Sequence, residues 1–253
     1  MSQNNPCEGC QTGSEFPIDF TMGFQPIVDT AARSIWGYEA LVRGVNGEGA
    51  AALLSAVTAE NRYKFDQACR VKAIELAGQK MPRGSKAKLS INFMPNAVYE
   101  PRACIRATLA AAKKFAFSPS RLMFEFTESE KFGDTTHIEN IVSSYKKMGF
   151  MTALDDFGAG YAGLALLAKF QPDLIKLDMD LIRGIQSSSS RKAILKGIIA
   201  IAADLHILLL AEGVETVDEM LFLNDSGVPL AQGYLFARPS TEEFAIHEQI
   251  NWH

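Results

Sequence analysis

Acids, amides and a lysine recur along the chain, each near the end of an apolar run. The clearest case is TALDDFGAGYAGL at 152–164, in which an apolar run stops at two adjacent aspartates, Asp155 and Asp156. Neighbouring side chains on a regular strand point to opposite faces, and adjacent carboxylates repel each other unless a cation lies between them. We therefore expect the strand to end there, with a turn of the backbone that brings both carboxylates to one cation site. The other residues of this kind are Glu39, Asn92, Glu125, Glu128, Lys176, Asp178, Glu212, Glu215 and Gln232.

Apart from Lys176, these side chains offer oxygen ligands, which favour hard cations such as Mg²⁺ or Mn²⁺ over zinc. The histidines do not join the set; they are His137, His206, His247 and His253. Two hard ions about 3.5–4 Å apart, bridged by a carboxylate, are the standard device for displacement at phosphorus. A lysine such as Lys176 could orient the attacking water or stabilise developing charge. Each residue taken singly could be a helix cap, a turn residue or part of an ordinary ion pair, but their convergence favours a metal site.

The surrounding pattern predicts strands that alternate with helices. The first two strands are separated by a short polar turn and should form an antiparallel hairpin. Apolar strands alternating with helices indicate a parallel sheet covered by helices. The expected strands are 20–29, 34–44, 88–95, 121–129, 150–158, 173–178, 206–215 and 229–239, and the expected helices are 50–80, 101–115, 135–148, 161–169, 188–204 and 216–225.

Eight strands over about 230 residues predict an α/β fold of the (β/α)8, TIM-like barrel type. An open doubly wound sheet is the alternative, but the first strand–helix turn lacks the glycine fingerprint of dinucleotide-binding folds. Seven of the eight predicted strands carry an acid, an amide or a lysine toward the same end. In such a barrel the active site is built at the carboxyl ends of the strands, so these side chains should meet there.

Composition narrows the class of protein. The 253 residues are 47% hydrophobic and 21% charged, with a net charge of −4. This balance argues against binding to DNA, and a phosphate ligand would need metal ions to supply positive charge. No apolar run is long enough to span a membrane and the amino-terminal segment lacks an apolar h-region, so we expect a soluble, cytoplasmic protein.

We expect two parts in the chain: a flexible polar leader over 1–18 and one barrel domain over 19–253. The leader contains a lone CxxC at Cys7 and Cys10, which we interpret as two exposed thiols because no second ligand pair lies nearby. Cys69 and Cys104 lie in apolar helical stretches and should be reduced core residues.

At these residues the sequence resembles the EAL-domain cyclic-di-GMP phosphodiesterases, over about residues 22–240. Glu39, Ala40 and Leu41 form the EAL signature. The sequences of the motifs are most similar to those of EAL domains that follow a blue-light-sensing flavin domain in some proteins. The other matching motifs occur in the family's order: FQPIVD (24–29), SINF (90–93), FEFTES (124–129), LDDFGAGYAGL (154–164), IKLD (175–178), AEGVET (211–216) and QGYLFARP (232–239).

The resemblance implies a barrel whose first strand runs antiparallel to the rest, and hydrolysis of cyclic di-GMP to linear pGpG. It implies two Mg²⁺ or Mn²⁺ ions bridged by Asp155. The first metal would be held by Glu39, Asn92, Glu125 and Asp155, and the second by Asp155, Asp156 and Glu212. Lys176 would position the nucleophilic water, so the catalytic set is Lys176, Glu212 and Glu39.

The resemblance also implies how substrate and regulation are arranged. Substrate would be held by Gln25, Arg43, Asp178 and Gln232. Glu128 would anchor the loop after the fifth strand, and Glu215 would support the site from behind the ligands. That loop is expected to contribute to a homodimer, and a separate sensor or regulator protein could supply the upstream signal. The loop sequence GAGYAG departs from the commoner GTGYSS, which bears on control by the loop rather than on the metal ligands.

Two other functions compete with hydrolysis of cyclic di-GMP. A catalytically silent receptor for cyclic di-GMP would usually lack a ligand such as the first-strand glutamate, but here the set is complete. A phosphodiesterase for other substrates, such as glycerophosphodiesters, is suggested by fold analogy alone, and such sites typically use histidines that this set lacks.

Overall fold

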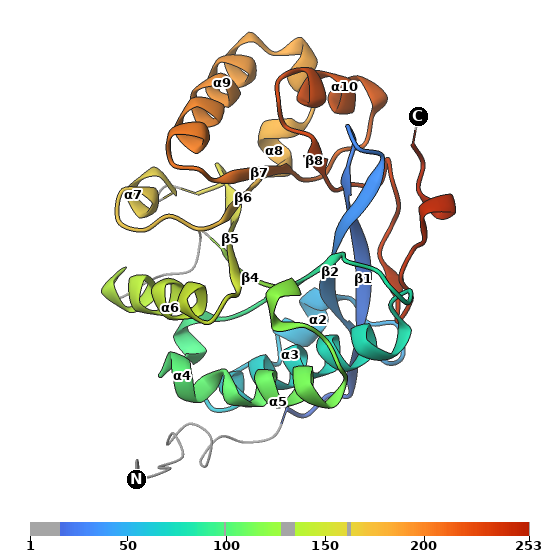
Figure 1. Ribbon diagram of the computed structural model, residues 1–253, viewed down its shortest axis with the longest axis vertical. Helices are drawn as coiled ribbons and strands as arrows, with labels where there is room; N and C mark the ends of the chain where they lie inside the picture. Colours follow the sequence, from blue (N-terminus) through green and yellow to red (C-terminus); the bar gives the residue numbers. More distant parts are fainter. Residues whose placement is uncertain (1–15, 99, 128–134, 161–162, 253) are drawn as a thin grey trace.

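The computed structural model describes residues 16–98, 100–127, 135–160 and 163–252. Within these residues, eight strands close into a barrel with helices arranged around it (Figure 1). Around the barrel each strand pairs with the next, β8 pairs with β1, and β1 pairs with β2. The strands are β1 Phe20–Asp29, β2 Ser34–Gly44, β3 Lys88–Asn92, β4 Leu122–Thr127, β5 Met151–Phe157, β6 Leu174–Leu177, β7 Leu208–Ala211 and β8 Leu230–Ala231.

Strand β1 runs antiparallel to both of its neighbours in the barrel, whereas β2 to β8 are parallel to one another. The TIM-like barrel with an antiparallel first strand is therefore confirmed. The β1–β2 hairpin has the predicted bounds, and its register places Gln25 opposite Glu39. The polar turn is held by the Asp29 carboxylate, whose Oδ1 accepts a hydrogen bond from the Ala32 N–H at 2.8 Å.

The helices differ from the prediction mainly at their interruptions. The expected helix over 50–80 is two helices because Asn61 forms a local turn: its Oδ1 accepts from the Thr58 N–H at 2.8 Å and its Nδ2 donates to the Ala56 carbonyl at 3.0 Å. The expected helix over 101–115 is also divided in two. The α-helices are α2 Ala50–Leu54, α3 Arg62–Lys80, α4 Pro101–Cys104, α5 Arg106–Lys114, α6 Thr135–Lys147, α7 Gly163–Leu167, α8 Met179–Ile182, α9 Ser189–Asp204 and α10 Val217–Asp225.

Three predicted strands are shorter than expected because the chain turns at the barrel mouth. The segment 88–95 leaves the strand after Asn92, before the 3-10 turn Pro95–Ala97. Of 206–215, only β7 is strand, and Gly213 then adopts a left-handed backbone with φ of 63°. Of 229–239, only β8 is strand, and the chain turns where the Phe236 N–H donates to the Gly233 carbonyl at 3.1 Å.

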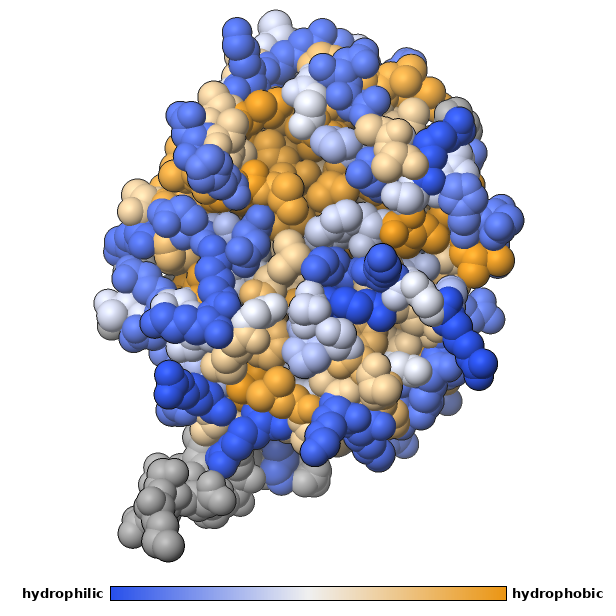
Figure 2. Space-filling view, viewed as in Figure 1, coloured by the Kyte–Doolittle hydropathy of each residue, from blue (hydrophilic) through white to orange (hydrophobic). Residues whose placement is uncertain are grey.

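An apolar layer fills the barrel directly beneath the polar residues. Its members lie two positions from a polar site residue on the same strand, so both point into the barrel. They are Ile27, Met123, Ala153, Leu174, Leu210 and Leu230. The opposite faces of the strands pack on the helices in a second, larger core. Hydrophilic side chains cover most of the rim of the face in Figure 2, with apolar ones gathered nearer its centre.

The last part of the chain covers the β1–β2 hairpin, running beside it in Figure 1. A short strand, β9 Ser240–Thr241, pairs with β1. Phe244 stacks on Phe24 with ring centroids 4.0 Å apart, and the Tyr38 hydroxyl donates to the Ala245 carbonyl at 2.7 Å. Cys69 and Cys104 are buried and take part in no disulfide, as expected of reduced core residues. Among the described residues, no helix combines the length and apolar character needed to cross a bilayer.

Candidate active site

Seven consecutive strands bring one polar side chain each to a single layer at the barrel mouth. Glu125 and Lys176 are completely buried there. The last two positions extend the sheet by one residue, because the Glu212 N–H donates to the Leu177 carbonyl at 3.0 Å and the Gln232 N–H donates to the Ala211 carbonyl at 2.8 Å. From β2 to β8 the side chains are Glu39, Asn92, Glu125, Asp155, Lys176, Glu212 and Gln232.

A β-bulge brings both adjacent aspartates to the mouth. Leu154 pairs with Ile175 and Phe157 pairs with Leu177, so Asp155 and Asp156 together lie opposite one residue of β6. Asp156 has a left-handed backbone with φ of 55°, a conformation that aspartate adopts more readily than most residues. The Asp156 N–H donates to Asp155 Oδ1 at 2.9 Å. The predicted turn of the backbone is therefore present, within the strand rather than after it.

The carboxylates form two groups that share one member. Oxygens of Glu39, Glu125 and Asp155 lie within 4.8 Å of one another, and so do oxygens of Asp155, Asp156 and Glu212. Asn92 lies beside the first group, where its Nδ2 donates to Glu39 Oε1 at 3.0 Å. The donors in both groups are oxygens, with no cysteine or histidine among the described members. This set fits hard divalent cations, with Asp155 able to contact two of them.

Lys176 lies at the centre of the carboxylates. Its Nζ is 2.7 Å from Glu212 Oε1, 2.9 Å from Glu125 Oε2 and 3.1 Å from Asp155 Oδ1, and 3.6 Å from Glu39 Oε1. One ammonium cannot balance the five carboxylates of the two groups. Two divalent cations would neutralise the four negative charges that remain when all five are ionised.

The same imbalance raises the pKa of several carboxyl groups. Burial, with the nearby Glu39 and Asp155 charges, raises the pKa of Glu125 to about 8 despite the opposing effect of Lys176. Burial and the Asp155 charge raise the pKa of Asp156 to about 6. The pKa of Glu212 is raised well above its ordinary value, again by burial first and then by Asp155. Without a metal, Glu125 therefore holds a proton through neutral pH, and Asp156 takes one up as the pH falls toward 6.

These raised pKa values predict a pH-dependent stability of the metal-free protein. Between the ordinary carboxyl pKa and the raised one, the folded state binds more protons than the unfolded state, so stability falls as pH rises. Each such proton lowers the unfolding free energy by up to about 1.4 kcal/mol per pH unit. Thermal melts in EDTA should shift to lower temperature from pH 6 to pH 8. Because metal competes with protons for these oxygens, the rise in Tm with Mg²⁺ or Mn²⁺ should be larger at pH 8, and an equal rise at both would contradict this.

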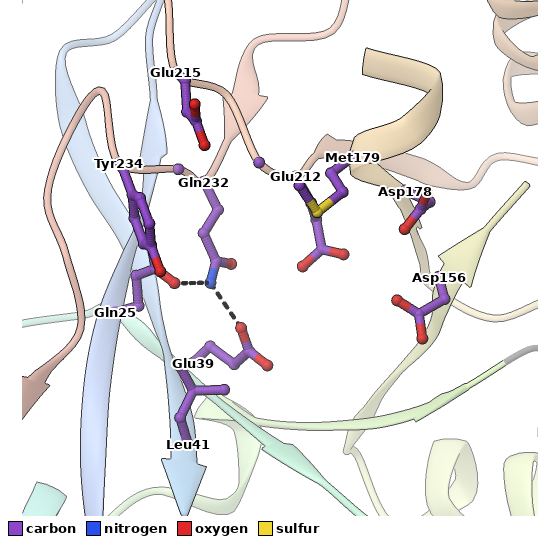
Figure 3. Close-up of a pocket in the computed structure, with 12 residues that line it drawn as sticks. Gln25, Glu39, Leu41, Asp156, Asp178, Met179, Glu212, Glu215, Gln232 and Tyr234 are labelled. Carbon is purple, nitrogen blue, oxygen red and sulfur yellow. Dashed lines mark hydrogen bonds between the residues drawn. The ribbon is translucent and has the colours of Figure 1, made fainter. Parts of the chain in front are cut away.

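A cavity of about 270 Å³ opens beside the carboxylates. In Figure 3, Asp156 and Asp178 lie on one side and Glu39, Gln25 and Gln232 on the other. Gln232 Nε2 donates to Glu39 Oε2 at 2.6 Å and to Gln25 Oε1 at 3.0 Å, as the dashed lines show. The cavity therefore presents amides and carboxylates next to the two carboxylate groups.

The structure brings most of the predicted residues to this place. Gln25, Asp178 and Glu215 line the cavity with Glu39, Asp156, Glu212 and Gln232. Glu215 also makes an ion pair with Arg183 at 2.8 Å. Arg43 lies two residues beyond Leu41 on β2, outside the cavity lining, and its Nη1 donates to the Val42 carbonyl at 2.7 Å. Glu128, Cys7 and Cys10 fall outside the described residues.

Several residues of the site were not predicted from the sequence. The Ser90 hydroxyl donates to Glu125 Oε1, and alternation could have found it, since Ser90 and Asn92 share one strand face. Met179 and Tyr234 line the cavity, but no pattern marked them. Gly233 allows the loops after β7 and β8 to touch, because a side-chain Cβ there would lie 2.0 Å from the Val214 carbonyl oxygen.

Known proteins are similar to this chain in sequence and in fold. The EAL domain family model matches residues 18–239. The blue light- and temperature-regulated antirepressor BluF of Escherichia coli is 34% identical over 221 residues, 87% of this chain. The cyclic di-GMP phosphodiesterase RocR of Pseudomonas aeruginosa is 35% identical over 161 residues, 63% of this chain. The chain spans 54% and 41% of the lengths of these two relatives.

Solved structures of EAL proteins are also similar to this chain. A standalone EAL protein from Vibrio cholerae, solved with cyclic di-GMP bound, is 52% identical with a TM-score of 0.86, covering 90% of this chain and 95% of that one. BlrP1 of Klebsiella pneumoniae, solved with manganese and cyclic di-GMP, is 36% identical with a TM-score of 0.80, covering 91% of this chain and 58% of that one. The resemblance seen in the sequence motifs is thus confirmed, and this chain belongs to the EAL domain family.

Proposed function

We propose that this protein hydrolyses one phosphodiester bond of cyclic di-GMP to give linear pGpG, using two Mg²⁺ or Mn²⁺ ions. The observation that carries the proposal is the sharing of Asp155 between two oxygen-ligand groups at the edge of one cavity. The relatives support the choice of substrate, because RocR is named a cyclic di-GMP phosphodiesterase and the Vibrio cholerae and BlrP1 structures contain cyclic di-GMP.

The protein side chains would divide the work as follows. Bound divalent ions supply positive charge for the phosphate oxygens and lower the pKa of a coordinated water. Lys176, buried among four carboxylates, would orient the attacking water and hold positive charge where negative charge develops. The first ion would be held by Glu39, Asn92, Glu125 and Asp155, and the second by Asp155, Asp156 and Glu212.

The substrate would lie in the cavity beside these ligands. Gln232 hydrogen-bonds both Gln25 and Glu39, so the two glutamines could offer amide groups to a phosphate or a guanine edge without rearranging the strands. Asp178, whose carboxylate caps α8 by accepting from the Asp180 N–H at 2.8 Å, lies on the opposite wall. Arg43 would reach a phosphate at the outer rim, and Glu128 and Glu215 would support the neighbouring loops.

The direct test is turnover of cyclic di-GMP by the purified protein with Mg²⁺ or Mn²⁺. We expect linear product from the wild type and none in EDTA, because the site then lacks its cations. Absence of linear product with either metal at every pH from 7 to 9 would refute the proposal.

A regulator that binds cyclic di-GMP without hydrolysing it is the second candidate, because the relative BluF is named an antirepressor. The two functions separate at Glu39, which the enzyme needs as a ligand. If Glu39→Ala abolishes turnover and leaves a cellular effect intact, the regulatory function is favoured. If both are lost while ligand binding persists, hydrolysis accounts for the effect.

We also propose a homodimer through the loop after β5. A groove of about 380 Å³ has this loop and α7 on one side and helix α9 on the other. Its lining includes Phe157, Leu164, Ile194, Ile198 and Ile201. Leu164 and Ile194 are 62% and 54% exposed, and paired apolar exposure of this kind is typical of association surfaces.

Charge placed on this groove should separate the two copies. Ile194→Glu should convert a dimer into a monomer, as measured by analytical ultracentrifugation, because a carboxylate would be buried in an apolar interface. Ile246→Glu, at a 43% exposed isoleucine outside the groove, is the matched control and should leave the mass unchanged. A wild type that sediments as a monomer at all concentrations would contradict the dimer.

A further inference from the structure

An ion pair is completely buried outside the barrel, where the proposed chemistry does not use it. Arg70 and Asp66 lie one turn apart on α3, with Nη2 to Oδ2 at 2.5 Å and side chains 0% and 1% exposed. Removing both charges from water is costly, so a buried pair often stabilises a fold no better than apolar residues of the same shape. The cost of burying this pair indicates a role other than stabilising the fold, and the contacts of Arg70 and Asp66 point to that role.

Arg70 contacts the residues next to two candidate ligands. Its guanidinium carbon lies 5.3 Å from the Phe93 ring centroid and 5.5 Å from that of Phe124, within cation–π range. Phe93 follows Asn92 directly and Phe124 precedes Glu125. The Phe93 N–H donates to the Glu125 carbonyl at 2.9 Å, so the two segments are also joined by their backbones. Neighbouring side chains on a strand point to opposite faces. Contacts that hold the Phe93 and Phe124 rings on the outer face therefore also fix the direction of the Asn92 and Glu125 side chains on the inner face.

Asp66 holds the same segment by its backbone. Its Oδ1 accepts a hydrogen bond from the Met94 N–H at 2.8 Å, two residues after Asn92. A cavity of about 360 Å³ is lined by Asp66, Asn92, Phe93 and Met94 among others. Packing therefore leaves this side of the segment unfilled, and the hydrogen bond to Asp66 is a specific restraint on it. The other end of the network is Tyr145 on α6, whose hydroxyl accepts from Arg70 Nη1 at 3.0 Å.

We propose that Arg70 and Asp66 are positioning residues that aim Asn92 and Glu125 at the first metal ion. The inference rests on the metal-binding function proposed above. The hydrogen bonds, ion pair and cation–π contacts of Arg70 and Asp66 described above lead to α6 and to the β3 and β4 segments, and none of them reaches Asp156 or Glu212 of the second carboxylate group. Loss of the network should therefore weaken one of two bound ions. Groups that orient metal ligands typically contribute 10–100-fold in affinity.

The test is Mn²⁺ binding by the full chain without substrate, followed by electron paramagnetic resonance of free Mn²⁺ and by calorimetry. In Asp66→Leu/Arg70→Met both charges are replaced by apolar side chains, an exchange that buried pairs often tolerate. We expect one Mn²⁺ to bind about 10–100-fold more weakly than in the wild type. Asp66→Asn/Arg70→Met restores an oxygen for the Met94 N–H and should recover part of that affinity.

A matched control lies at the other end of the barrel. Asp173 Oδ2 accepts from the Thr152 N–H at 2.8 Å, and Oδ1 pairs with Lys146 at 3.3 Å. Asp173→Asn should lower Tm and leave both Mn²⁺ affinities unchanged, which distinguishes positioning from a general loss of stability. Wild-type affinity in a folded Asp66→Leu/Arg70→Met variant would overturn the inference.

Two further outcomes are decisive. If that variant does not fold, Tyr145→Phe removes only one hydroxyl from the network and should weaken one Mn²⁺ by ~2- to 5-fold, the effect of one hydrogen bond; an unchanged affinity would then overturn the inference. A wild type that binds no Mn²⁺ overturns the proposed function, and the positioning role with it.

Discussion

Replacing Asp155 with asparagine should abolish turnover of cyclic di-GMP and disturb both metal ions, whereas Asp156→Asn should mainly weaken one. Asp155 belongs to both carboxylate groups and Asp156 to only one. Loss of several kcal/mol of charge stabilisation corresponds to a fall in kcat/KM on the order of 10³-fold or more. The measurement is steady-state production of linear dinucleotide at saturating Mn²⁺, paired with Mn²⁺ titrations of each variant.

The two variants control for each other. Asparagine is close in size to aspartate and tolerates the left-handed backbone at position 156, so neither change should disturb the bulge. We expect Asp156→Asn to regain activity as the Mn²⁺ concentration is raised, because one weakened ion can be restored by mass action. Equal losses in the two variants, with no response to added metal, would show that Asp155 has no bridging role.

Replacing Lys176 with methionine should destabilise the metal-free protein by about 3–5 kcal/mol near pH 8, the usual cost of leaving buried charges without their partner. Lys176 Nζ contacts four carboxylates, and among the described residues no other lysine or arginine pairs with them. The pKa of Lys176 is raised well above its ordinary value by these carboxylates, which outweigh its burial. Its charge is therefore constant below the ordinary lysine pKa, and its stabilising effect would be lost only as pH rises through the raised one.

The carboxyl groups decide how this loss varies with pH. Since the pKa of Glu125 is raised to about 8, lowering the pH toward 5 protonates it and should reduce the cost of Lys176→Met in denaturant titrations. Mn²⁺ should stabilise the variant more than the wild type, yet turnover should stay low because the group proposed to orient the water is gone. Lys146→Met is the control: its pair with Asp173 is partly exposed, so the change should cost less than about 1 kcal/mol. Full activity of Lys176→Met would contradict the proposed role.

Much of the fold could be predicted because its signals are local. The hairpin bounds follow from apolar strands on either side of the Asp29–Arg33 turn, and they agree with the structure. The alternation of strands and helices, with the size of the chain, led to a closed barrel. The site could be predicted as a set because the carboxyl ends of parallel strands meet at one edge, whatever the details of each loop.

The rest depends on contacts that no local pattern records. The break in the first helix arises from hydrogen bonds of Asn61 to Thr58 and Ala56, in a stretch whose apolar spacing is otherwise helical. The bulge at Asp156 depends on the register between β5 and β6. Arg70 has the appearance of a surface residue in the sequence, and only the assembled barrel places Phe93 and Phe124 around it.

The antiparallel first strand also sets the order in which the molecule can be assembled. One edge of β1 pairs with β2, which follows at once in the chain, but the other edge pairs with β8 and β9, through contacts such as Val28 with Ala231 and Gly23 with Thr241. During synthesis on the ribosome, that second edge stays open until almost the whole chain has emerged, and an open strand edge can pair with other chains. The wall that places Gln25 beside Gln232 is thus among the first parts made and the last to be completed.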